Sequence, residues 1–223
     1  MIESEQGEEH PDMMNEHQKM VKEAYDASAG TYAEKNFHEL DYKPLDRQIL
    51  DCFSAMVTPG GLVCDIGCGP GEIADYLHKK NLNVVGIDIS DTMIQEAQRL
   101  NPDIGFDTGD MFGLGVPDNH FSGMCSFYAI VNFQYEDIRN IFREYHRVLK
   151  KDGILLISFH VGEQSIGVDD FYESGKPLVF YYFDEQKILE LLGDAGFEIL
   201  EALVRFPYRE EYQPDFARRR KRR

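Results

Sequence analysis

Three glycines follow an apolar run at a spacing that suits a bound ligand. Residues 62–66 are apolar apart from Asp65, and Gly67, Gly69 and Gly71 come directly afterwards. Glycine accepts positive φ angles and has no Cβ, so a ligand can approach the backbone closely. The N–H groups of such a turn and of the helix start behind it form a polar cradle. These residues therefore predict a binding loop between a strand and a helix.

A carboxylate closes the next apolar run, residues 83–88, and it belongs to Asp88. At the end of a strand, a carboxylate can accept hydrogen bonds from both hydroxyls of a ribose, as in nucleotide-binding α/β proteins. The glycines and Asp88 together predict a nucleotide-like ligand. The alternative is a tight strand–helix turn that binds nothing, which three glycines and two flanking acids disfavour.

The spacing of the three glycines differs from that of a dinucleotide-binding site. The dinucleotide motif reads Gly-x-Gly-x-x-Gly. Here the third glycine comes one place early, and Glu72 occupies its usual position. An NAD(P)-dependent oxidoreductase is therefore a disfavoured alternative.

Strands and helices that alternate along the chain must position these residues. Pro44 and Gly196 are placed to begin and to end a helix, and Ser90 or Asp91 to cap one. Alternation indicates parallel strands with helices on both faces, and ligands bind at the carboxyl ends of such strands. We expect helices at 14–37, 44–56, 72–80, 91–99, 135–149 and 184–195, and strands at 62–66, 83–88, 103–107, 121–127, 153–159, 179–182 and 197–206.

The composition of the chain disfavours several classes of binding partner. The net charge of −17 disfavours nucleic acid, because an acidic surface repels phosphates. No apolar run approaches the ~20 residues that span a bilayer, and the polar N-terminus predicts no signal peptide. The four cysteines show no metal-ligand spacing and predict no metal site. We expect all four cysteines to be reduced and mostly buried thiols, which favours a cytoplasmic protein.

The two ends carry opposite charge. Residues 1–13 are acidic and without periodicity, which predicts disorder. Residues 218–223 are all basic, and we interpret them as a solvated tail rather than a nucleic-acid or membrane contact. Between them we expect a single domain, residues 14–217, with a helical cap at 14–57 and an α/β core at 58–217.

The run Asp65-Ile-Gly67-Cys-Gly69-Pro-Gly71 resembles motif I of class I S-adenosylmethionine (SAM) methyltransferases, of the type 11 or 25 kind. The resemblance extends over residues 25–209 and includes the opening Tyr25-Asp-Ala-Ser-Ala-Gly and the turn Gly109-Asp110-Met111. It implies a Rossmann-like α/β fold: a mostly parallel seven-stranded sheet, with helices on both faces and an antiparallel C-terminal strand. It also implies SAM as the cofactor.

The resemblance assigns roles residue by residue. Asp88 binds the ribose, Ile89 packs on the adenine, Asp110 accepts from the adenine amino group, and Met111 covers the ring. The implied cofactor-binding residues are Tyr32, Lys43, Asp65, Gly67, Cys68, Gly69, Asp88, Ile89, Met93, Asp110, Met111, Phe127 and Asn132.

Catalysis of methyl transfer mainly requires alignment of nucleophile, methyl group and sulfur. A base is needed only if the nucleophile must lose a proton, and His160, just past the strand at 153–159, is the candidate by position. Tyr128 is the second candidate, to place the substrate. Many relatives have histidine where Asn132 stands, and an asparagine cannot act as a base.

The acceptor is expected to be a small molecule, because no extra domain is present to hold a macromolecule. Aromatic residues at 171–183 suggest an apolar pocket wall, although at least half of them are expected in the core. The alternative functions are a non-catalytic SAM-binding protein and, less favoured, the oxidoreductase. The sequence leaves open a monomer or a homodimer.

Overall fold

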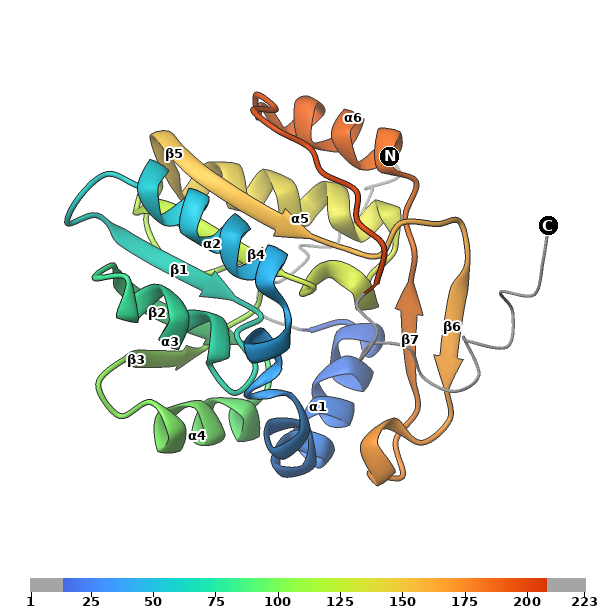
Figure 1. Ribbon diagram of the computed structural model, residues 1–223. Coiled ribbons are helices and arrows are strands. Elements are labelled where there is room, and N and C mark those ends of the chain that lie inside the picture. Colours follow the sequence, from blue (N-terminus) through green and yellow to red (C-terminus); the bar gives the residue numbers. More distant parts are fainter. Residues whose placement is uncertain (1–13, 208–223) are drawn as a thin grey trace, which may run out of the picture.

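The computed structural model describes residues 14–207 (Figure 1). The predicted disordered segment 1–13, the basic tail 218–223 and the last ten residues of the predicted domain lie outside these residues.

A five-stranded parallel sheet forms the centre of the fold, in the order β3-β2-β1-β4-β5. The predicted strands at 62–66, 83–88 and 121–127 are confirmed to the residue. All carboxyl ends lie along one edge, because every neighbouring pair is parallel. The strands are β1 (Leu62–Ile66), β2 (Asn83–Asp88), β3 (Gly105–Thr108), β4 (Phe121–Phe127) and β5 (Leu149–Ser158).

Six α-helices cover the two faces of this sheet, as alternation predicts (Figure 1). Val63 of β1 packs in one core with α2, α3 and α4, whereas Cys64 and Ile66 pack in a second core with α1, α5 and α6. Successive side chains of β1 thus point to opposite faces of the sheet and pack against different layers of helices. The helices are α1 (Glu16–Asn36), α2 (Pro44–Met56), α3 (Glu72–Lys79), α4 (Asp91–Leu100), α5 (Tyr135–Val148) and α6 (Glu185–Ala195).

Local signals set several helix ends. Pro44 is the first residue of α2, and the hydroxyl of Ser90 accepts from Met93 N at 3.1 Å to cap α4. Gly196 ends α6 in the left-handed conformation, with φ of 103°. These three boundaries confirm the sequence prediction. Short 3-10 helices η1 (Glu39–Tyr42), η2 (Ile130–Asn132) and η3 (Phe171–Glu173) lie in the connections.

The last strands differ from the prediction of a seven-stranded sheet. β6 (Ser165–Val168) and β7 (Leu178–Tyr181) form a separate antiparallel hairpin. β7 corresponds to the predicted strand at 179–182. β6 is absent from our prediction because its residues, Ser-Ile-Gly-Val, carry little β signal.

Residues 197–206 form no strand, although most of them are apolar. At one end Phe197 packs on His146 of α5, with ring centroids 5.3 Å apart, and at the other Arg205 binds Asp46 of α2. Those two helices cover opposite faces of the sheet, so the segment crosses from one layer to the other instead of pairing along an edge. Leu200 and Phe206 are consequently 62% and 79% exposed. The apolar pattern predicts a strand here because a local pattern contains no information on these two long-range contacts.

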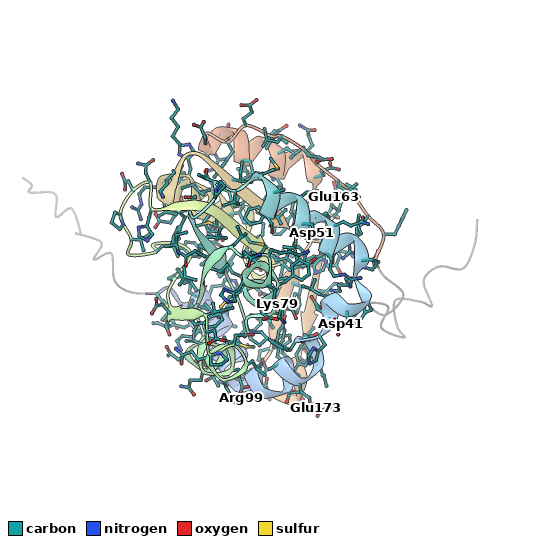
Figure 2. All side chains as sticks on the ribbon, turned by 60° about the vertical axis from the view of Figure 1, so that its left-hand side comes forward. Asp41, Asp51, Lys79, Arg99, Glu163 and Glu173 are labelled. Carbon is teal, nitrogen blue, oxygen red and sulfur yellow. The ribbon has the colours of Figure 1, made fainter. Side chains whose placement is uncertain are left out.

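Charged side chains dominate the surface around this core (Figure 2). Asp41, Asp51, Lys79, Arg99, Glu163 and Glu173 are all exposed. No helix within residues 14–207 is long and apolar enough to cross a membrane.

Candidate active site

The glycine turn between β1 and α3 has the backbone geometry that only glycine adopts readily. Gly67, Gly69 and Gly71 have φ angles of 68°, 51° and 85°. The N–H groups of Gly67 and Cys68 donate to the carbonyl of Ile87, at 2.7 and 3.1 Å. The loop is therefore fastened to the neighbouring strand β2.

Space as well as φ requires glycine at one of these positions. A Cβ on Gly67 would lie 2.5 Å from the Cβ of Ala129, whereas a Cβ on Gly69 would meet only Tyr32 Cε1, at 3.8 Å. Gly67 thus lets two loops pack together, and Gly69 faces a less crowded region beside Tyr32.

Asp88 ends β2 and is tied to the glycine turn. Its Oδ2 accepts from Gly69 N and its Oδ1 from Ser90 N, both at 2.9 Å. Burial raises the pKa of the Asp88 carboxyl, and these two hydrogen bonds oppose the rise. Asp88 still lines the cavity described below.

Asp65 has a structural contact beneath the turn. Its carboxylate is 1% exposed, and its Oδ2 accepts from Ala74 N, in the first turn of α3, at 3.0 Å. A carboxylate suits this place because it accepts from the free N–H groups at a helix start. Burial raises the pKa of Asp65 to about 7.

A cavity of about 80 Å³ lies at the carboxyl ends of the strands. Ten of the predicted site residues line it: Tyr32, Gly67, Gly69, Asp88, Ile89, Asp110, Met111, Phe127, Tyr128 and Asn132. Five do not: Lys43, Asp65, Cys68, Met93 and His160. Met93 is buried in α4, and Cys68 faces the Cα of Gly86 from within the turn. A more open hollow at the opposite end of the sheet is lined by Thr58–Gly61 and Lys150–Gly153, and contains none of these groups.

Helix α1 closes the cavity, and our sequence analysis missed most of its contacts. Gln18 Nε2 donates to Asp110 Oδ2 at 2.8 Å, and Tyr25 Oη donates to Asn132 Oδ1 at 2.9 Å. Val21 also lines the cavity. The spacing of residues 18, 21, 25 and 32 puts them on one face of a helix, and this signal was available in the sequence.

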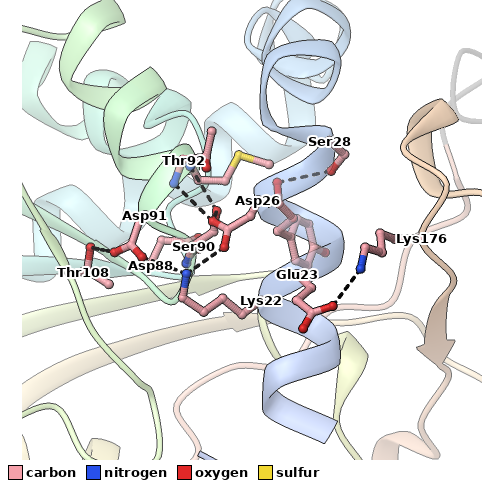
Figure 3. Close-up of polar contacts among 12 residues, drawn as sticks. Lys22, Glu23, Asp26, Ser28, Asp88, Ser90, Asp91, Thr92, Thr108 and Lys176 are labelled. Carbon is pink, nitrogen blue, oxygen red and sulfur yellow. Dashed lines mark hydrogen bonds and ion pairs between the residues drawn. The ribbon is translucent and has the colours of Figure 1, made fainter. Parts of the chain in front are cut away.

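An ionic network fastens α1 to the start of α4 (Figure 3). Asp26 Oδ1 accepts from Ser90 Oγ at 2.7 Å and from Thr92 N at 3.2 Å. Lys22 Nζ donates to Asp26 at 2.7 Å and to Asp91 at 2.8 Å. Ser90 links this network to Asp88, so α1 is held directly over the end of β2.

Beside Tyr32, the charged residues Glu39, Lys43 and Glu72 form a cluster, in which Lys43 is buried and the two glutamates are partly buried. Lys43 Nζ lies 2.8 Å from Glu39 Oε2. Burial, followed by the charge and hydrogen bond of Glu39, raises the pKa of the Glu72 carboxyl. Glu72 Oε2 is buried and has no hydrogen-bond partner among residues 14–207. An unpartnered buried acceptor of this kind indicates a place for a donor group.

Tyr128 and His160 lie in one aromatic stack. The His160 ring is 4.8 Å from the Tyr128 ring and 5.0 Å from the Tyr182 ring, measured between centroids. Tyr128 lines the cavity, and His160 lies outside its lining. Asn132 is held by Tyr25 and by the carbonyl of Val179, to which its Nδ2 donates at 2.8 Å. Within the described residues, no three His, Cys, Asp or Glu side chains are grouped to hold a metal.

Comparison with known proteins finds similarity to methyltransferases. A family profile described as a methyltransferase domain matches residues 63–153. The chain is 33% identical over 146 residues to phosphoethanolamine N-methyltransferase 1 of Arabidopsis thaliana. The aligned residues cover 63% of this chain and 29% of that protein. It is 27% identical over 183 residues to magnesium-protoporphyrin O-methyltransferase of Synechocystis, covering 74% and 76%. The chain thus spans less than a third of the Arabidopsis protein.

Solved structures share the fold. Magnesium protoporphyrin IX methyltransferase from Synechocystis, with bound S-adenosylhomocysteine (SAH), gives a TM-score of 0.64 at 22% identity, over 86% of this chain and 96% of that chain. The [4+2]-cyclase SpnF gives a TM-score of 0.53 at 25% identity, over 70% and 59%. Because one neighbour is a cyclase, the fold by itself does not set the reaction.

Proposed function

We propose that the chain is a class I SAM-dependent methyltransferase and that it transfers a methyl group from SAM to a small-molecule acceptor. One observation carries the proposal. The glycine turn, Asp88 and Asp110 meet the candidate substrate-facing residues Tyr128 and Asn132 around a single cavity. A cofactor site and an acceptor site are thus adjacent at the carboxyl ends of the strands, where this architecture places ligands.

The residues present fit SAM. Gly67 and Gly69 leave the backbone of the turn accessible, and Asp88 supplies a carboxylate for the ribose hydroxyls. Asp110 Oδ2 already accepts from the amide of Gln18, so an adenine amino group would take over an existing type of contact. Beside Tyr32, Glu72 Oε2 is an acceptor without a partner among the described residues, and we propose that it receives the ammonium group of the amino-acid part of SAM.

When bound, SAM supplies a methyl group made electrophilic by the adjacent positive sulfur. The protein's part is alignment. Asp88 and Asp110 would hold the ribose and the adenine of the nucleoside, and α1, which is tied to the cavity wall through Gln18 and Tyr25, would cover it. The same helix excludes water, because Val21, Tyr25 and Tyr32 line the cavity.

Proton chemistry is a small part of this proposal. Asn132 cannot act as a base, and it is held by Tyr25 and Val179. His160 contacts Tyr128 but does not line the cavity. We therefore favour an acceptor that reaches the site with an unprotonated nucleophile, or one whose proton leaves through a water. His160 as a base is thus the less favoured alternative, and it is tested below.

The acceptor class rests on the relatives and on the size of the site. Their names include phosphoethanolamine, demethylmenaquinone and magnesium protoporphyrin as small-molecule acceptors. The aromatic residues of the hairpin region support a compact site, since Phe171 is buried and packs on Tyr25 at 5.3 Å. We propose a cytoplasmic protein, because its four cysteines are free. A monomer or a homodimer stays a prediction from the sequence.

The test is methyl transfer from isotopically labelled SAM to a panel of phosphoethanolamine, a demethylated quinol and magnesium protoporphyrin, with a metabolite extract as the open-ended sample. The proposal expects a labelled product and stoichiometric SAH. Tight SAM binding without SAH formation from any sample would favour the alternative of a non-catalytic SAM-binding protein. A matched control is Asp51→Asn, because Asp51 is an exposed residue of α2 that does not line the cavity.

A further inference from the structure

One arginine connects the end of the described chain to the wall of the cavity. Nε and Nη2 of Arg205 donate to Oδ1 and Oδ2 of Asp46, each at 2.9 Å. The Asp46 side chain is 2% exposed and that of Arg205 16%. Two parallel charge-assisted bonds to a buried carboxylate fix the plane of the guanidinium. Asp46 is itself fixed, because it lies in the first turn of α2, where a helix favours a negative charge.

The same guanidinium reaches Tyr128. Nη2 of Arg205 donates to the Tyr128 hydroxyl at 3.2 Å. Tyr128 follows β4 with a φ of 54°, an uncommon angle for a residue other than glycine. Its N–H donates to Ser158 Oγ at 2.9 Å and to Ser158 O at 3.2 Å. A backbone in this conformation persists only where its surroundings hold it, and here Ser158 holds the backbone while Arg205 holds the phenol.

The ring between these two attachments contacts both the cavity and His160. Tyr128 lines the cavity beside Gly67 and Asn132. The ring also contacts the imidazole of His160, and Tyr182 stacks on this imidazole with an interplanar angle of 25°. A shift of the Tyr128 ring would therefore change the acceptor side of the cavity and the stack on His160 together.

We propose that Arg205, held by Asp46, is a positioning residue that sets the Tyr128 ring at the acceptor side of the cavity. Asp46 orients Arg205, Arg205 fixes the hydroxyl, and the ring presents a constant surface to the acceptor. The inference rests on the proposed function for its effect on turnover. It also gives the exposed segment 197–206 a role, since this segment carries Arg205 to the site.

The first test needs no acceptor. The ring-proton signal of His160, assigned through a His160→Gln variant, is shifted upfield when tyrosine rings cover the imidazole. We expect Arg205→Gln and Asp46→Asn to move this signal downfield, with and without SAH. Arg99→Gln is the matched control, because Arg99 pairs with Glu96 on the exposed side of α4 (Figure 2). An unmoved His160 signal in folded Arg205→Gln overturns the proposal.

The second test separates positioning from general stability. With the acceptor that the panel identifies, Arg205→Gln should lower kcat/KM by about tenfold or more, while the dissociation constant of SAH stays within about twofold. Tyr128→Phe keeps the ring and removes the hydroxyl, so it should show the same split. Arg205→Gln added to Tyr128→Phe should cause no further loss, because residues that act as one unit are not additive.

The outcomes remain distinct if a variant or the proposed function fails. If Arg205→Gln does not fold, Tyr128→Phe decides: an unchanged His160 signal and unchanged kcat/KM overturn the inference. If the wild type methylates no acceptor, the proposed function fails, and the His160 signal still reports whether Arg205 holds Tyr128. Additive losses in the double variant would also contradict the inference, because Arg205 would then act by another route.

Discussion

The carboxylate of Asp88 accepts a hydrogen bond from the backbone N–H of Gly69, over 2.9 Å. This bond joins the end of β2 to the glycine turn after β1. It sets the distance between the acid expected on a ribose and the backbone expected under the rest of the ligand. The two strongest sequence signals are therefore one unit in the structure.

The first prediction concerns Asp88. Asp88→Ala should weaken SAM binding by about 1–3 kcal/mol, because two hydroxyls lose a charged acceptor. Calorimetry on the folded variant measures it, with Asp51→Asn as the surface control. An affinity equal to that of the wild type would remove Asp88 from the site.

The second prediction concerns pH. The folded protein raises the pKa of Asp65 to about 7 by burial, while an unfolded aspartate titrates near 3.8. Between these values the folded state binds more protons, so this group's contribution to the free energy of unfolding decreases as pH rises from about 4 to about 7. Asp65→Asn should remove a pH-dependent term on the order of 3–4 kcal/mol, since an amide oxygen can still accept from Ala74 N.

Urea unfolding at several pH values measures this term as the difference between wild type and Asp65→Asn. The difference is needed because other carboxylates, such as Asp26 and Glu144, have lowered pKa values and act in the opposite direction. Parallel curves for the two proteins between pH 4 and 7 would show that Asp65 is ionised throughout.

The third prediction concerns α1. The cavity of about 80 Å³ is smaller than the ~300 Å³ or more of pockets that enclose small molecules. We therefore expect part of its wall to move when a cofactor enters, and we expect that part to be α1, which polar side-chain contacts hold in place. Asp26→Ala removes the acceptor for Ser90 and Thr92 (Figure 3). Amide hydrogen exchange in residues 18–30 should then become faster, and SAM should slow it in the wild type. Equal exchange with and without SAM would place the cofactor elsewhere.

The fourth prediction concerns His160. Because this imidazole contacts Tyr128 but does not line the cavity, His160→Asn should lower kcat by less than about tenfold, and leave the pH dependence of kcat between pH 6 and 9 unchanged. A base would give a loss of ~10²–10⁴ with a changed profile. That larger loss would return His160 to the mechanism, through a rearranged Tyr128.

Sequence signals of short range predicted the fold well. The glycine turn, the caps at Pro44, Ser90 and Gly196, and the period of the strands each act through neighbours along the chain. The contacts that the sequence did not predict join residues far apart along the chain. Asp46 and Arg205 lie 159 positions apart and Gln18 and Asp110 92 apart, and no local pattern pairs such residues. The same reason explains the missing strand at 197–206, whose path is set by its two anchors.

The central claim is that the cavity at the glycine turn binds SAM, and calorimetric titration of the wild type with SAM, SAH and NAD⁺ tests it most directly. Gly69→Val is the matched variant, because its side chain would enter the region beside Tyr32, and Gly193→Ala is the control, since no atom lies within 4 Å of the added Cβ. The account predicts one site for SAM and SAH, no binding of NAD⁺, loss of binding in Gly69→Val and none in Gly193→Ala. Binding of NAD⁺ in place of SAM, or equal SAM binding by folded Gly69→Val, would contradict it.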